Sequence, residues 1–99
     1  MKDVRITVLK RTCYSDLIEK YENPLENPCE MKIGSIYISL GGKKPDGFCE
    51  NAWRCIKPYA ISLANGGSDF FDGWMKNTYS AMVSCDDGFR PVTFYVEAI

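Results

Sequence analysis

Cysteine is the residue type in this chain with the widest scope for chemistry, because histidine is absent. Without imidazole there is no Ser-His or Cys-His nucleophile pair and no His-containing zinc site. The five cysteines stand at positions 13, 29, 49, 55 and 85, with no Cys-x-x-Cys spacing, so a disulfide framework is not indicated. A phosphate-binding glycine motif is also missing, and the sequence therefore favours a protein that is not an enzyme of the usual hydrolase, kinase or dehydrogenase kinds.

Cys49 is the candidate reactive thiol. It falls in the first turn of the longest predicted helix, where the positive end of the helix dipole favours a thiolate, although a cover formed by Phe48 and Trp53 would favour the neutral thiol. A soft metal would need several thiolates, with Cys29, Cys55 or Cys85 converging on Cys49. Core packing is the favoured interpretation of Cys49 and Cys85, and no metal or other cofactor is expected.

A segment rich in aromatic residues offers a different kind of site. Residues 66–76 read GGSDFFDGWMK, and their large apolar side chains follow neither strand nor helix periodicity. Such a loop either completes the core or forms a recognition surface. The helix face that carries Trp53 could form the other side of this site, and the Arg90 guanidinium could hold a carboxylate or phosphate. The ligand-binding candidates are therefore Trp53, Phe70, Phe71, Trp74, Met75 and Arg90.

The elements that must position these residues follow from hydrophobic periodicity. Alternation predicts strands over residues 3–10, 36–40, 79–85 and 92–97, and helical spacing predicts a short helix over 15–22 and a long one from Cys49 to the stop at Asn65-Gly66-Gly67. The order β-α-β-α-β-β predicts an α+β fold, a mostly antiparallel sheet with the long helix packed on one face and a C-terminal hairpin. Residues 23–34, with two Asn-Pro steps, are expected to be a loop.

The C-terminal hairpin is predicted from Asp86-Asp87-Gly88, with Gly88 in the left-handed conformation. Two adjacent carboxylates suggest a divalent-ion or acid-base pair, but an Asp at a turn more often accepts hydrogen bonds from its own backbone. Arg90, which follows, is expected to pair with Asp87 or Glu97 when it holds no ligand.

Length and charge set the broad class. Ninety-nine residues with 45% apolar content are sufficient for one globular domain, residues 1–99. The formal net charge of −1 is spread along the chain, which argues against nucleic-acid binding. No apolar stretch is long enough for a signal peptide or a membrane span, so a cytoplasmic protein without membrane association is expected.

The ordered set of short motifs is similar to a bacterial and archaeal family of roughly hundred-residue uncharacterised proteins. The stretches that carry the resemblance run from the first strand to the last: Ile6-Thr-Val-Leu-Lys-Arg11, Pro28-Cys29, Pro45-x-Gly47-Phe-Cys49, Ala52-Trp53, Gly66-Gly67, Trp74-Met-Lys76 and Asp87-Gly-Phe-Arg-Pro-Val92. The resemblance implies a small cytosolic protein of one domain and brings no activity with it.

Three functions follow from these features. The first is a small cytosolic binding module, which would hold a small molecule or a protein partner between the Trp53 helix face and residues 66–76. The second is a thiol-dependent redox or soft-metal protein that uses Cys49 with Cys29, Cys55 or Cys85. The third is a structural subunit, such as a homodimer formed through the aromatic segment.

Overall fold

The computed structural model describes residues 1–24 and 31–99. Along the chain it has strand β1 (Val4–Arg11), helix α1 (Ser15–Tyr21), strand β2 (Ile36–Ser39), the short 3-10 helix η1 (Leu40–Gly42), helix α2 (Glu50–Ala64), and strands β3 (Ser80–Ser84) and β4 (Val92–Ala98). The described residues therefore confirm the predicted α+β order, with each boundary within a few residues of its expected place. Of the predicted 23–34 loop, residues 25–30 lie outside the described part.

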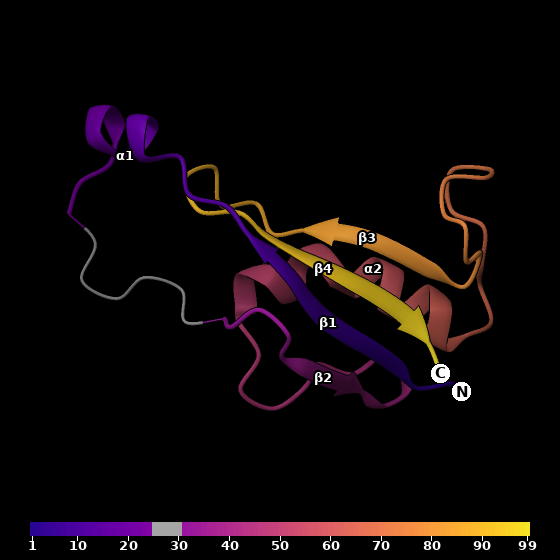
Figure 1. The fold of residues 1–99 in the computed structure, drawn as a ribbon. Helices are drawn as coiled ribbons and strands as arrows, with labels where there is room; N and C mark the ends of the chain where they lie inside the picture. Colours follow the sequence, from indigo (N-terminus) through magenta and orange to yellow (C-terminus); the bar gives the residue numbers. More distant parts are fainter. Residues whose placement is uncertain (25–30) are drawn as a thin grey trace.

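The strands of the described residues form one antiparallel sheet in the order β2-β1-β4-β3. The first and last strands are neighbours at its centre, where Val4 lies opposite Ala98 and Arg11 opposite Val92, with a shift of register between Val8 and Lys10. The predicted C-terminal hairpin is the pair β3-β4. Both chain ends accordingly lie together at one end of the sheet (Figure 1).

Helix α2 lies across one face of this sheet and closes the core (Figure 1). The buried residues of α2 recur at helical spacing, as amphipathic packing requires. Pro58 lies within the continuous helix, on its exposed side. The sheet contributes alternate residues of its strands, and Phe94 makes ring contacts with Phe48, the residue before the helix N-cap. The buried apolar core consists of Val4, Ile6, Val8, Met31, Phe48, Ala52, Trp53, Ile56, Ala60, Leu63, Ala64, Ala81, Val83, Val92, Phe94 and Val96.

Strand β2 turns its alternating apolar residues away from this core. Ile36 and Ile38 are 58% and 38% exposed, whereas Ser39 is fully buried. Tyr37, between the two isoleucines, packs edge-on against the core residue Phe48 with centroids 4.9 Å apart, so the alternation of the strand places Ile36 and Ile38 on the other side. The buried Ser39 hydroxyl is satisfied, because it donates to the Lys43 carbonyl at 2.7 Å. The isoleucines therefore face the open side of the sheet.

Helix α1 projects from the end of the sheet opposite the chain termini, beside the β3-β4 turn (Figure 1). None of its residues is buried. It is held by a backbone bond from the Tyr14 N–H to the Phe89 carbonyl and by an ion pair between Arg90 and Glu22 at 2.7 Å, with both side chains mostly covered. Arg90 thus pairs with neither of the carboxylates expected from the sequence, since its partner comes from a segment far away in the chain.

The β3-β4 turn also differs from its expected backbone. Gly88 is not in the left-handed region, so the prediction of a left-handed glycine there is wrong. The turn is held instead by Asp87, whose Oδ1 accepts the N–H groups of Phe89 and Arg90 at 2.8 and 3.2 Å. This is the hydrogen bonding typical of aspartate at turns. The Asp87 carboxylate therefore stabilises the turn, as the sequence predicts.

Candidate functional site: an aromatic loop beside helix α2

The end of α2 fixes where the following loop begins. Gly66 is left-handed at φ 86°, its N–H donates to the Leu63 carbonyl at 3.1 Å, and the Gly67 N–H donates to the Ser62 carbonyl at 2.7 Å. These paired bonds are those of a Schellman motif, which satisfies carbonyl groups that the helix end would leave free. Residues 65–79, here called the aromatic loop, therefore leave the helix along a defined path.

Two further contacts close the aromatic loop at its base. The Asp69 N–H donates to the Thr78 carbonyl at 2.7 Å, and the Asn77 side-chain amide lies 3.3 Å from the Tyr95 hydroxyl on β4. The loop is therefore joined across its base and tied to the sheet, while its tip projects away from the strands (Figure 1).

Four aromatic rings form a continuous surface where this loop meets α2. Phe70 packs edge-on against Tyr59 with centroids 5.2 Å apart, Tyr59 lies 6.5 Å from Trp74, and Trp74 is edge-on to Phe71 at 5.2 Å. Exposure increases outward, because Phe70 is half-buried against the core while Trp74 is 42% and Phe71 72% exposed. We call Tyr59, Phe70, Phe71 and Trp74 the aromatic surface.

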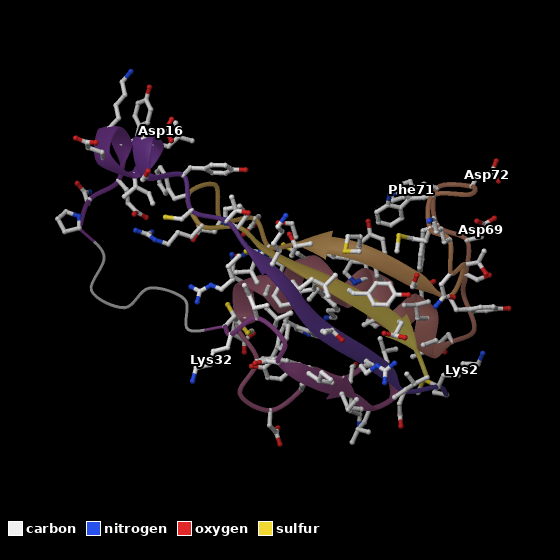
Figure 2. All side chains as sticks on the ribbon, viewed as in Figure 1. Lys2, Asp16, Lys32, Asp69, Phe71 and Asp72 are labelled. Carbon is white, nitrogen blue, oxygen red and sulfur yellow. The ribbon has the colours of Figure 1, made fainter. Side chains whose placement is uncertain are left out.

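The loop tip adopts a backbone that side chains normally avoid. Asp69, Phe71 and Asp72 all have positive φ, at 53°, 56° and 47°, and Gly73 follows at 88°. Aspartate tolerates this region, and the Asp69 carboxylate accepts the Gly73 N–H at 2.9 Å. A phenylalanine has no such compensation, so the conformation that holds the Phe71 ring at the surface costs free energy. Figure 2 shows all three residues on this projecting loop, with the Phe71 ring on one side and the two aspartates on the other.

The sequence-predicted ligand residues are only partly brought together. Phe70, Phe71 and Trp74 belong to the aromatic surface, and Met75 follows them, half-buried. Trp53 is 8% exposed, and its ring contact is with Phe48 in the core. The aromatic residue of α2 that meets the loop is Tyr59, six residues further along. Its spacing on the apolar helix face, close to the loop that follows, was the signal available in the sequence.

Arg90 lies at the other end of the sheet from the aromatic loop, because β3 runs from Ser80 beside the loop to Ser84 near the turn. It lines a hollow of about 400 Å³ with Arg11, Thr12 and Cys13. Its ion pair with Glu22, which sequence reasoning missed, occupies part of its hydrogen-bonding capacity. Arg90 and the aromatic surface therefore do not contribute to one site.

The described cysteines do not assemble into one cluster, although Cys85 lies near enough to Cys55 to contribute to its raised pKa. Cys49 is the N-cap residue of α2, one position before the first turn, and is half-buried against the core like Cys55 and Cys85. Cys13 is exposed, and Cys29 lies outside the described residues. Within residues 1–24 and 31–99, no three Cys, Asp, Glu or His side chains come together in a way that could hold a metal ion.

Cys55 and Asp86 form a small electrostatic group on the helix side of the β3-β4 turn. Burial raises the pKa of the Cys55 thiol, and the neighbouring Asp86 carboxylate raises that pKa further. Arg54 donates to Asp86 at 2.8 Å and, with the Asn51 side chain, lowers the pKa of the Asp86 carboxyl. Cys55 is thereby kept a neutral thiol, which is a poor nucleophile and a poor metal ligand.

Comparisons with known proteins found no match to this chain. No protein-family model matches it, and no match was found among curated proteins or solved structures. The similarity to an uncharacterised family stays a prediction. In the described part of the chain, no helix has the length and apolar character needed to cross a membrane.

Proposed function

We propose that this protein is a small binding module whose aromatic surface contacts a protein partner. The observation that carries the proposal is Phe71, a large apolar side chain that is 72% exposed and held in the left-handed region. A loop that only completed the core would bury this ring, and unfavourable backbone conformations concentrate at functional sites. Aromatic side chains are enriched among the residues that anchor protein interfaces, and here the exposed rings rest on half-buried ones.

The surface differs from the site expected from the sequence, because Tyr59 replaces Trp53 as its helix residue. It is a projecting patch, and a protein partner fits it better than a small molecule, which generally needs a concave site. Cytoplasmic location and the absence of nucleic-acid and membrane partners remain part of this proposal. The clustered Lys and Arg that a phosphate backbone requires are not found on the aromatic loop, where Lys76 is the single basic residue.

Site-specific photo-cross-linking tests the proposal. A benzoyl-phenylalanine placed at position 71 is expected to give a discrete covalent adduct in cells, and the adduct should disappear when Trp74→Ala removes the neighbouring ring. The same probe at Tyr21, which is 66% exposed on α1, is the matched control. The adducted protein is then purified and its affinity for the wild type and for Trp74→Ala is measured by calorimetry.

The outcomes separate the candidate functions. Equal adducts at positions 71 and 21, or none at 71, would contradict the proposed surface. An adduct between two copies of the chain would support the structural homodimer instead. The thiol-dependent alternative gains little support from the geometry, because Cys49, Cys55 and Cys85 pack against the core and no group of three potential metal ligands forms among the described residues.

A further inference from the structure

The aromatic surface combines exposed ring faces with carboxylates on the same short segment. Successive rings are steeply inclined, with interplanar angles of 79° for Tyr59 and Phe70 and 80° for Phe71 and Trp74. Phe71 is 72% exposed and Trp74 42% exposed, so parts of both rings remain open to a partner. Ring faces carry negative electrostatic potential and attract cations, tryptophan most strongly.

The carboxylates at the tip reinforce this preference. Asp69 and Asp72 flank Phe71 closely in sequence, both are exposed, and Figure 2 shows them on the same projecting tip. Asp69 Oδ1 is engaged by the Gly73 N–H, while Asp72 makes no hydrogen bond or ion pair with any described residue. Lys76, the basic residue of the loop, is absent from the ion pairs formed within the described part of the chain. The tip therefore carries negative charge that no ion pair within the described residues neutralises, on the same loop as the rings.

The charge decides between classes of partner group. A purely apolar partner would remove water from the Asp72 carboxylate without pairing it, which is costly, and an anionic partner would be repelled. A guanidinium can stack on the Trp74 or Phe71 face while it donates to a carboxylate, and it loses less hydration than an ammonium. The aromatic loop carries both kinds of group, exposed rings and exposed carboxylates.

We infer that the aromatic surface binds an arginine side chain of a protein partner, which stacks on an exposed ring and is attracted by the negative charge of Asp69 and Asp72. This inference rests on the proposed function and specifies the chemistry of the contact. Because part of the attraction is electrostatic at an exposed site, the interaction weakens as salt increases.

Nuclear magnetic resonance of the two tryptophan indole N–H groups provides the test. The probe is the peptide acetyl-Gly-Arg-Gly-Arg-Gly-amide, and the control peptide carries citrulline, a neutral isostere, in place of both arginines. The arginine peptide is expected to shift the Trp74 signal and leave the buried Trp53 signal in place, with an affinity about tenfold above that of the citrulline peptide. Trp74→Phe assigns the signals.

Two substitutions locate the charge effect. Asp72→Asn is expected to lower the affinity for the arginine peptide several-fold, whereas Asp16→Asn, which removes an exposed carboxylate from α1 (Figure 2), leaves it unchanged. Equal binding of both peptides, no shift at millimolar peptide, or equal effects of the two substitutions would overturn the inference. The cross-link at position 71 is independent of these results, so the proposed function can stand when the arginine inference fails.

Discussion

At the scale of single residues, electrostatics and backbone strain determine the behaviour of the most informative side chains. Cys55 has its pKa raised by burial and by Asp86, while the pKa of Asp86 is lowered by Arg54. Phe71 is held in a conformation that only glycine adopts freely. In both places a neighbour or a turn determines the chemistry, and the residue type alone does not.

The first prediction concerns the Cys55 thiol. Asp86→Asn removes the negative charge that raises its pKa, so alkylation of Cys55 by iodoacetamide at pH 8 to 9 should accelerate a few-fold. Exposed Cys13 should react at an unchanged rate and serves as the internal standard in peptide mass spectrometry. An equal change at both cysteines would show that Asp86 does not act on Cys55.

The same pKa has a consequence for stability. The unfolded thiol titrates near the ordinary value of 9.0, and the folded thiol titrates above it. Between the two values the unfolded chain binds fewer protons, so the Cys55 contribution to stability is lost as the pH rises from about 9 upward. Cys55→Ala should flatten this part of the stability profile, measured by urea unfolding.

The second prediction concerns strain at Phe71. Phe71→Gly and Phe71→Ala both remove the ring contact with Trp74, but only glycine accepts the φ of 56° without cost. The glycine variant should therefore be more stable than the alanine variant by about 1–2 kcal/mol, as measured by urea unfolding. Both variants should lose the partner contact. Equal stabilities would mean that the loop relaxes and stores no strain.

At the scale of elements, the end of α2 and the path of the aromatic loop depend on two glycines that are needed for different reasons. Gly66 supplies the left-handed conformation, whereas Gly67 supplies space. A Cβ on Gly67 would meet the Ser62 carbonyl oxygen at 2.8 Å, too close for a real contact, and would also collide with the Ser62 hydroxyl. The helix terminus therefore positions the aromatic surface through backbone proximity.

The third prediction follows from this contact. Gly67→Ala should destabilise the protein by about 1–3 kcal/mol, because either Ser62 or the Schellman turn must move. Gly88→Ala is the matched control, since Gly88 has no positive φ and open space around its Cβ position, and it should change stability by less than about 0.5 kcal/mol. Thermal unfolding measures both. Comparable losses would contradict a specific role for the Gly67 contact.

At the scale of the whole molecule, stability depends on the two-layer core between α2 and the sheet. Phe94 is fully buried on a central strand, where its cross-strand neighbours are Val8 and Val83 and its ring packs against Phe48. A domain of this size is stabilised by about 5–15 kcal/mol in total. One large void in this core therefore removes a substantial fraction of the stability.

The fourth prediction uses the alternation of β4. Phe94→Ala should cost about 3–5 kcal/mol in the free energy of unfolding, whereas Thr93→Ala, next to it on the open face, should cost about 1 kcal/mol or less. Urea unfolding monitored by circular dichroism compares the two. Similar costs would mean that the α2 face of the sheet does not carry the core.

Much of the fold could be predicted because its signals are local. Alternation in β1, β3 and β4 and helical spacing in α2 depend on neighbours within a few residues, and these elements form where the sequence predicts them. The candidate site was predictable in part for the same reason, since Phe70, Phe71 and Trp74 lie on one short segment. The charge state of Cys55 was not, because it depends on Asp86 across the fold.

The sequence by itself determined the α+β order, the apolar face of α2 and the presence of a loop rich in aromatic residues. Only the tertiary structure decided that Ile36 and Ile38 face outward, that Arg90 pairs with Glu22, and that Tyr59 replaces Trp53 beside the loop. The physical reason is common to all three. Periodicity states that one side of an element is apolar, but which side is covered, and which distant residue covers it, depends on elements far away in the chain.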